Sequence, residues 1–411
     1  MKNKLALTIA KIEEQKENLI SFCQDLVRIP SLSGKEGEIA KIVTQQMEAL
    51  GYTEVSTDEL GSVLGTLKGK NRISILFNGH MDHVPAGSLD NWSVDPFGAT
   101  IKEVGGQRAI FGRGVVDMKG ALAAQVFAGG MLCQLGITPP GDLHVAAVVH
   151  EEDHEGSAME YIITQRGVRP DLVVLGEPTS LNLSIGQKGR CELEVVTKGR
   201  TSHGSKPELG INAVYHMAKI VEAVEQLNKQ QMPQHEFLGR ASVALIRISC
   251  SPGQGNVIPD GCRIVLDRRT LPAEREEDLI EEVNQFLGEV KAKVPNLDAR
   301  VRIMEENLQC YTGKKLVAHK YYPAWAMAHS DPFIQKTKTI LEAMMNSEVK
   351  IQKWDFSTDG VYTAGMAKIP TIGYGPGDET QAHSPDEHLF IDQLVTATKG
   401  YAALALNLGV S

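Results

Sequence analysis

The chain has 411 residues, of which 42% are hydrophobic and 23% charged, and this composition is typical of a globular protein. A chain of this length is too long for one compact core. Two domains are therefore expected. The formal net charge of -9 argues against a nucleic-acid partner, because nucleic acids select basic surfaces. The six cysteines form no CxxC pair, which indicates reduced thiols and a reducing compartment.

The N-terminus predicts an amphipathic helix rather than a targeting sequence. Its short apolar stretch LALTIA is followed by Lys11, Glu13 and Glu14. The sequence has no apolar run of about 18 residues, the length that a membrane-spanning helix needs. We therefore expect a cytoplasmic protein with no membrane partner.

In chain order, the first part alternates helical periodicity with short apolar runs. The expected elements are helices over 5–28, 36–50 and 118–135, and strands over 73–79, 143–149 and 171–176. Strands that are apolar throughout are typical of a sheet covered on both faces, so the fold class is α/β. Such sheets place ligands at the carboxyl ends of their strands.

After Gly186 the pattern changes to shorter, alternating strands. The expected elements are strand 191–199, helix 211–230, strands 241–249 and 262–270, helix 274–292 and strand 299–305. This βαββαβ order is typical of a ferredoxin-like unit. We therefore predict an inserted domain over 187–308 within a larger domain made of 1–186 and 309–411. The later elements of the larger domain are helix 330–345 and strand 369–375.

Five segments carry acids or histidines just beyond apolar runs or in loops. These residues are His80 and Asp82, Asp117, the pair Glu151 and Glu152, Glu177, and His383. Each alone has a simpler explanation: a loop histidine is usually at the surface, an aspartate before a helix is usually a cap, and paired glutamates usually face water. Together they match the nitrogen and oxygen ligands of zinc or a related divalent ion.

In this order, the stretches GHMDHVP, GRGVVDMKG, Glu-Glu, LGEPT and AHSPDE resemble the metal motifs of the M20 metallopeptidase family. That family includes acetylornithine deacetylase, succinyl-diaminopimelate desuccinylase and glutamate carboxypeptidase. HEFLGR, KWDFSTDG and GPGDETQAHSP also resemble a bacterial subgroup of selenium-metabolism-linked hydrolases. The resemblance covers nearly the whole chain. It implies a catalytic domain with a mixed sheet flanked by helices, and an inserted ferredoxin-like α+β domain that serves as lid and dimerisation domain.

The resemblance also implies a site for two divalent ions, with zinc expected and cobalt or manganese as alternatives. Asp117 would bridge the ions. His80 and Glu177 would complete one ion's shell, and Glu152 and His383 the other's. A further implication is a cis peptide bond after Asp117.

Carried over in the same way, the function is hydrolysis of the amide bond of an N-acyl amino acid or small peptide. A metal-bound hydroxide would be the nucleophile and Glu151 the general base, while Asp82 would hold the His80 ring. If the glutamate pair is extended, its side chains point opposite ways, so Glu152 can face a metal and Glu151 the water. A dipeptidase or carboxypeptidase of the same family, or a non-catalytic binding relative, stays possible.

Four further residues match family positions around the substrate. His203 would donate to the oxyanion, in many members from the partner subunit of a homodimer, while Asn256, Arg269 and Asp359 would contact the small-molecule substrate. The guanidinium of Arg269 would suit a carboxylate, because its fork binds two oxygens. A solvated surface role is the simpler alternative for His203 and Arg269.

The chain also departs from the family pattern near these motifs. His150 stands where many members have aspartate, and Asp355-Phe356-Ser357 replaces the usual Gly–Gly before Asp359. His83 and His154 are additional histidines near the metal motifs. Either could compete for metal, although a surface or supporting role is the simpler expectation.

Overall fold

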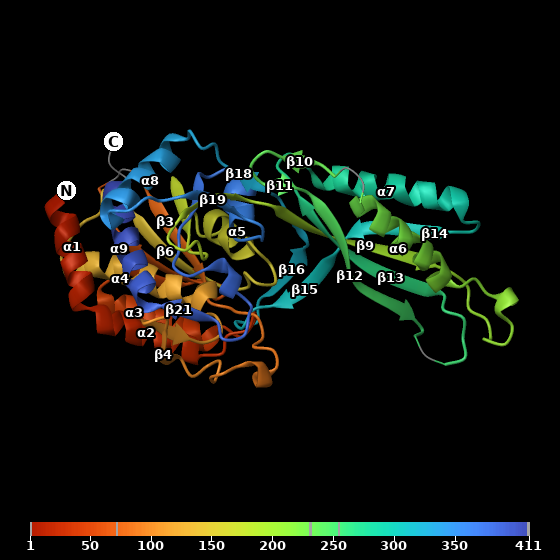
Figure 1. Cartoon of the computed structure of the whole chain (residues 1–411), viewed down its shortest axis with the longest axis horizontal. Coiled ribbons are helices and arrows are strands. Elements are labelled where there is room, and N and C mark those ends of the chain that lie inside the picture. The colour runs from red at the N-terminus through yellow and green to blue at the C-terminus, as the bar shows by residue number, and fades with distance from the viewer. Residues whose placement is uncertain (1, 71–72, 230–231, 254, 409–411) are drawn as a thin grey trace.

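The computed structural model describes residues 2–70, 73–229, 232–253 and 255–408. Some predicted segments extend beyond the described residues. These are residue 230 of the predicted helix 211–230, and residues 1, 71–72 and 409–411 of the predicted catalytic domain. Figure 1 shows two lobes side by side along the longest axis. The first and last parts of the chain share one lobe, and the middle of the chain forms the other.

A mixed sheet forms the centre of the first lobe and has nine strands among the described residues. Its strands, in spatial order, are β1 (Glu54–Thr57), β2 (Val63–Leu67), β6 (Leu143–Val148), β3 (Ile75–His80), β7 (Leu172–Leu175), β20 (Thr371–Gly373), β8 (Leu183–Gln187) and β18 (Trp325–Ala326), with β19 (Ile351–Trp354) beside β8. Strand β3 is parallel to both its neighbours, β6 and β7. The carboxyl ends of these three strands therefore meet at one edge of the sheet.

Helices cover both faces of this sheet, which confirms the α/β prediction. They are α1 (Lys2–Glu14), α2 (Lys16–Arg28), α3 (Gly37–Leu50), α4 (Gly120–Gln134), α5 (Ser157–Thr164), α8 (Pro332–Met345) and α9 (Ile391–Asn407). Alternate side chains of β3 point to opposite faces: Phe77 packs in the cluster that contains α4 and α9, and Leu76 in the cluster that contains α5. Both side chains are fully buried, and every residue of this strand is buried, including the polar Asn78 and His80 at its carboxyl end.

Two helices differ from what their sequences suggest. The predicted helix over 5–28 is wrong as a single element, because α1 and α2 are separated at Gln15. Backbone hydrogen bonds from Gln15 to Lys11 and from Leu19 to Gln15 continue across the break, so the periodicity is preserved and conceals it. The segment Val115–Gln134 is long and apolar enough to cross a membrane despite Asp117 and Lys119, so the expectation that no such segment exists is wrong. Its most apolar window is nevertheless 94% buried inside the fold.

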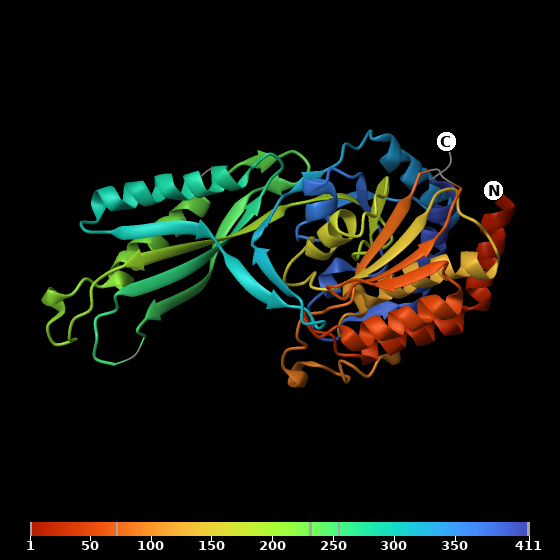
Figure 2. The ribbon, with the colours of Figure 1, turned by 180° about the vertical axis from the view of Figure 1, so that it is seen from behind.

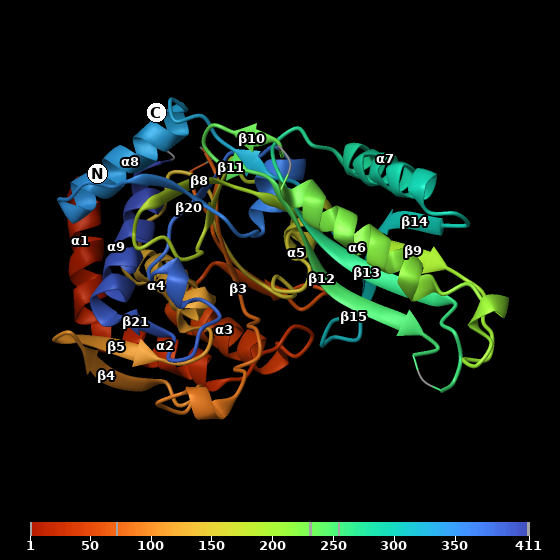
Figure 3. The same ribbon diagram turned by 45° about the vertical axis from the view of Figure 1, so that its right-hand side comes forward.

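The second lobe has the predicted βαββαβ order. Its elements are β9 (Gly189–Lys198), α6 (Ala213–Lys229), β12 (Ser242–Ser251), β13 (Gly261–Thr270), α7 (Glu276–Lys293) and β14 (Asp298–Ile303). The sheet order is β12-β13-β9-β14, and all these pairs are antiparallel. Both helices pack on the apolar face of this sheet (Figure 3), in a core of their own. We call this lobe the lid.

A hairpin of β15 (Glu305–Gln309) and β16 (Lys315–His319) lies between the two lobes (Figure 2). At its tip the Tyr311 hydroxyl donates to the carbonyl of Gly61 at 3.0 Å, in the first lobe. At its base His319 lies 3.0 Å from Glu276, at the start of α7 in the lid. Strand β17 (Tyr321–Tyr322) then pairs with β9. The predicted domain boundaries at 186/187 and 308/309 therefore fall inside β8 and β15.

Candidate metal centre

The acids and histidines of the five motifs converge at the carboxyl edge of the central sheet. Glu151 and Glu152 follow β6, His80 ends β3, Glu177 follows β7, Asp117 precedes α4, and His383 lies in the loop before β21 (His388–Phe390). Because β3, β6 and β7 are parallel neighbours, side chains at these three strand ends share one space. The other two segments reach that space from loops.

Asp117 lies at the centre of this group and faces a different histidine with each oxygen. Its Oδ1 is 2.9 Å from Nε2 of His80, and its Oδ2 is 3.1 Å from Nε2 of His383. The same His383 atom is 3.2 Å from Oε2 of Glu152, and His80 Nε2 is 3.6 Å from Oε1 of Glu177. A carboxylate that bridges two cations needs this division of its oxygens between two sets of ligands.

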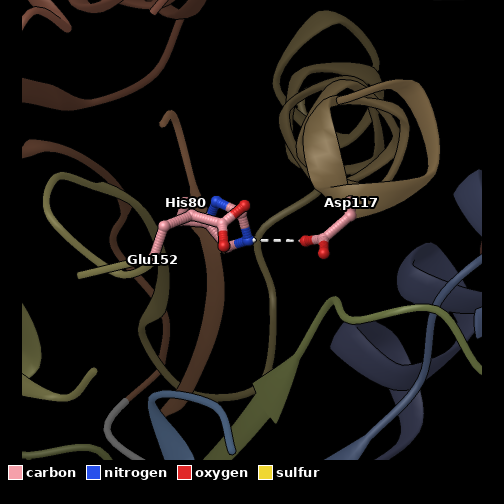
Figure 4. Close-up of side chains that lie close together, drawn as sticks. All are labelled: His80, Asp117 and Glu152. Atoms are coloured by element: carbon pink, nitrogen blue, oxygen red, sulfur yellow. Dashed lines mark hydrogen bonds and ion pairs between the residues drawn. The ribbon is translucent and has the colours of Figure 1, made fainter. Parts of the chain in front are cut away.

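Two groups of possible ligand atoms are compact enough to hold an ion. Atoms of His80, Asp117 and Glu152 all lie within 4.8 Å of one another, and Figure 4 shows these three side chains facing each other. Atoms of His80, Glu151 and Glu177 form a second such group. Both sets consist of imidazole nitrogen and carboxylate oxygen, which suit zinc and related divalent ions.

The charges of this cluster favour a cation. Burial raises the pKa of Glu151 and Glu177 well above the usual range, and neighbouring carboxylates raise it further. Hydrogen bonds to Asp117 and Glu152 raise the pKa of His383 to about 10. Atom Oε1 of Glu151, like Oε1 of Glu152, is buried with no hydrogen-bond partner among the described residues. Glu151, Glu177 and His383 thus bind a proton more tightly than usual. A bound divalent ion would stabilise the negative charge of the carboxylates in place of those protons.

The two glutamates stand in a turn, so the expected extended conformation is wrong. Glu151–Asp153 form the turn, and His150 before it has a positive φ of 56°. Buried carboxylates accept three successive backbone N–H groups here: Glu36 accepts that of His150 at 3.1 Å, and Asp82 accepts those of Glu151 and Glu152 at 3.2 and 3.1 Å. Both glutamates consequently line the same cavity.

A buried carboxylate also holds the loop of Asp117 by accepting backbone hydrogen bonds. The carboxylate of Glu387 accepts the backbone N–H groups of Gly114, Val116 and Asp117 at 2.9, 2.7 and 3.2 Å, and pairs with Arg113 at 2.6 Å. The peptide bond after Asp117 is cis, which confirms the expectation from the family resemblance.

The His80 ring is oriented mainly by the main chain. Its Nδ1 donates to the backbone carbonyl of Asp82 at 2.9 Å, while the nearest carboxylate oxygen of Asp82 is 3.6 Å away. Donation from Nδ1 leaves Nε2 free to face Asp117 as a ligand atom.

A cavity of about 390 Å³ opens over the cluster, within the usual range for a small-molecule site. The first lobe lines it with Asp117, Glu151, Glu152, Glu155, Glu177, Phe356, Ser357, Glu379, Ala382 and His383, and the lid lines it with Arg190 and Arg269. The predicted residue Arg269 is thus placed at the cavity. Arg190, Glu155 and Glu379 were missed, because nothing in their local sequence separates them from ordinary surface charges.

Three other predicted substrate residues lie away from this cavity. His203 and Asn256 are neighbours, since the N–H of Gly204 donates to the Asn256 carbonyl at 2.8 Å. They lie beyond the far end of β9, whose ten residues span about 33 Å and whose near end carries Arg190. Asp359 is buried and accepts from Asn78 and from the N–H of Gly156, both at 2.7 Å.

The additional histidines have partners of their own. Nε2 of His83 accepts the backbone N–H of Ser31 at 2.8 Å, and Nδ1 of His154 lies 3.3 Å from the Tyr322 hydroxyl. Burial lowers the pKa of both imidazoles to about 4, with Lys119 contributing at His83 and Lys320 at His154. Both rings are therefore neutral near pH 7.

Known proteins resemble this chain in sequence and in fold. Residues 76–407 match the sequence model of peptidase family M20/M25/M40. The chain belongs to this family. It is 32% identical over 402 residues to the uncharacterized protein YgeY of Escherichia coli K12, covering 98% of this chain and 97% of YgeY. It is 27% identical over 388 residues to acetylornithine deacetylase of Proteus mirabilis, covering 91% and 92%.

Solved structures show the same fold. The Bacillus subtilis protein YXEP, a dinuclear metal-binding peptidase of the M20 family, superposes with a TM-score of 0.70 at 16% identity, covering 97% of this chain and all of YXEP. Membership of the M20 family makes the chain a metal-dependent hydrolase that acts on C–N bonds of amides or peptides.

Proposed function

We propose that this M20 enzyme cleaves the amide bond of an N-acyl amino acid or small peptide in the cytoplasm, using two divalent ions. The ligands are His80, Asp117, Glu152, Glu177 and His383. The observation that carries the proposal is the position of Asp117, whose two oxygens face His80 and His383 at 2.9 and 3.1 Å. Zinc is the expected ion, and the dinuclear peptidase YXEP supports a pair of ions.

Bound ions would supply Lewis-acid activation of water and of the amide carbonyl. Glu151 acts beside them as the general base. Its Oε1 has no hydrogen-bond partner in the part of the chain that the structure describes, and its carboxylate lines the cavity. Burial raises the pKa of Glu151, which helps this carboxylate to take a proton from water and pass it to the leaving amine.

Substrate binds between the lobes, in the cavity that Arg269 and the carboxylates of the cluster both line. Closure of the lid excludes water and brings the reacting groups together. Asp359 contributes indirectly, because its carboxylate fixes Asn78 and the backbone of Gly156 rather than lining the cavity.

The enzyme acts as a homodimer through the lid. Strand β12 lies at the edge of the described lid sheet, and it exposes Ile246 and Ile248 by 47% and 59%. A strand at the edge of a sheet with exposed apolar side chains suits association with a second copy across a two-fold axis. His203 and Asn256, remote from the cavity of their own chain, then serve the partner's cavity.

Mixing two inactive variants tests this arrangement. A dimer of one His203→Ala subunit and one Glu151→Gln subunit keeps one complete site if His203 acts across the interface, so activity returns on mixing. Absence of any recovery, with mixed dimers verified by mass, would mean that His203 acts within its own chain. A His203→Ala homodimer that is active by itself would mean that the reaction does not need His203.

The reaction itself is tested by a screen of N-acyl amino acids and dipeptides. Protein loaded with zinc, cobalt or manganese, and a chelated control, are each scored by amine release. Release from N-acyl amino acids supports the deacylase, and release from dipeptides alone supports a peptidase of the same family. A metal-loaded protein that binds these compounds without releasing amine would be a non-catalytic relative.

A further inference from the structure

Two arginines of the lid stand directly opposite each other at the cavity. Arg190 on β9 is in register with Arg269 on β13, and Tyr322 on β17 is in register with Arg190. Residues opposite each other on antiparallel strands project from the same face of the sheet, with Cα atoms about 5 Å apart. Both arginines line the cavity over the metal cluster.

The next pair of opposed residues on these two strands also carries like charges. One step along the same face, Glu192 on β9 is in register with Asp267 on β13. Like charges opposite each other destabilise a sheet, and this patch has two such pairs. Exchanging Arg269 and Asp267 would produce opposite-charge pairs in both rows. The observed order instead keeps both guanidiniums in the row that lines the cavity.

Each guanidinium is held in place by its own acid. Arg269 donates through Nε and Nη2 to the two oxygens of Asp267 at 2.8 and 3.1 Å. Arg190 pairs with Glu155 at 3.0 Å, and its guanidinium lies 5.0 Å from the centre of the Tyr322 ring. These contacts use only part of the five N–H donors of each arginine. The Nε of Arg190 is buried with no hydrogen-bond partner among the described residues.

We propose that Arg190 and Arg269 each bind one carboxylate of the substrate, so that the preferred substrate is the N-acyl derivative of an amino acid with two carboxylates. One guanidinium fork matches one carboxylate, and two forks on adjacent strands match two. Arg190 is then the residue that distinguishes a dicarboxylate from a monocarboxylate. This inference rests on the proposed function, since it takes the amide to be cleaved at the cluster across the same cavity.

Binding of succinate and its monoamide, succinamate, tests the inference without turnover. Both probes have one carboxylate that can bind metal or Arg269, and they differ only in the second. Isothermal titration of zinc-loaded wild-type protein should show succinate bound about tenfold more tightly or better. Arg190→Gln should reduce that ratio to near one. Arg300→Gln, which changes an exposed arginine on β14 away from the cavity, should preserve it.

Equal binding of the two probes by wild-type protein would overturn the inference. So would an Arg190→Gln protein that keeps the preference, or that loses affinity equally for both probes, since Arg190 would then not read the second carboxylate. Amine release from N-acyl derivatives of neutral amino acids, without a preference for succinate, would contradict the inference and leave the proposed function intact. A preference for succinate in a protein that releases no amine would support two carboxylate-binding arginines and contradict the proposed function.

Discussion

Asp82 accepts the backbone N–H of Glu151 at 3.2 Å, so a carboxylate beside the His80 ring also fixes the turn that carries the proposed general base. Asp82 is fully buried, and it accepts a further hydrogen bond from the hydroxyl of Ser33 at 2.7 Å. One side chain thus connects two strand ends of the site. The geometry of the glutamate pair depends on these buried acceptors as much as on the glutamates themselves.

Glu151→Gln should retain two ions and lower kcat by about 10²–10⁴-fold, because glutamine keeps the shape of the side chain but cannot take a proton. Elemental analysis and amine release measure the two effects separately. Glu160→Gln, an exposed change on α5, serves as the control and should change neither. Loss of an ion from Glu151→Gln would instead make Glu151 a ligand, as its closeness to His80 and Glu177 permits.

Asp117→Ala should lose metal and the thermal stability that metal provides, since this residue faces both histidines of the cluster. Metal at 100 times its Kd stabilises a folded protein by about 2.7 kcal/mol. Scanning calorimetry should therefore show that zinc raises the Tm of wild-type protein and leaves that of Asp117→Ala unchanged. His80→Ala should behave in the same way. An equal shift by zinc in wild type and both variants would place the ions elsewhere.

Glu36 should support the glutamate turn through its hydrogen bonds rather than its charge. Glu36→Gln keeps an oxygen that can accept from the N–H groups of Gly34 and His150, whereas Glu36→Ala removes it. An unpaired buried N–H costs about 1–3 kcal/mol, so Glu36→Ala should have a free energy of unfolding lower than that of Glu36→Gln by this amount. Urea unfolding of both chelated variants measures the difference. Equal stabilities would show that water or a rearranged turn replaces the acceptor.

His83 should make the chelated protein less stable as the pH falls. Burial lowers its folded-state pKa to about 4, below the unfolded value of about 6.5, so the unfolded state binds more protons between these values. The stability from the neutral ring is complete above the unfolded pKa and is lost as pH falls toward 4, by on the order of 3 kcal/mol.

The measurement compares urea unfolding at several pH values between 4 and 7. His83→Gln should reduce the slope of this dependence, because glutamine can accept the N–H of Ser31 without titrating. His154, whose pKa burial also lowers to about 4, keeps its own contribution. His329→Gln, at an exposed position, should retain the wild-type slope. If His83→Gln also retains that slope, other groups are responsible for it.

Much of the fold follows from local patterns that the sequence displays directly. Phe77 and Leu76 are adjacent and both apolar, which predicts a strand buried on two faces, and the structure confirms it. The order of elements in the lid was predicted for the same reason, since strand and helix periodicities depend on near neighbours. The break at Gln15 was not, because it leaves the periodicity unchanged.

The sequence by itself determined which residue types end the strands, and five ordered motifs determined the family. Only the tertiary structure decided that the oxygens of Asp117 divide between His80 and His383, and that Arg190 stands opposite Arg269. It also placed His203 far from the cavity of its own chain. The physical reason is that strand order and register join segments distant in sequence, and no local pattern records which partner each segment meets.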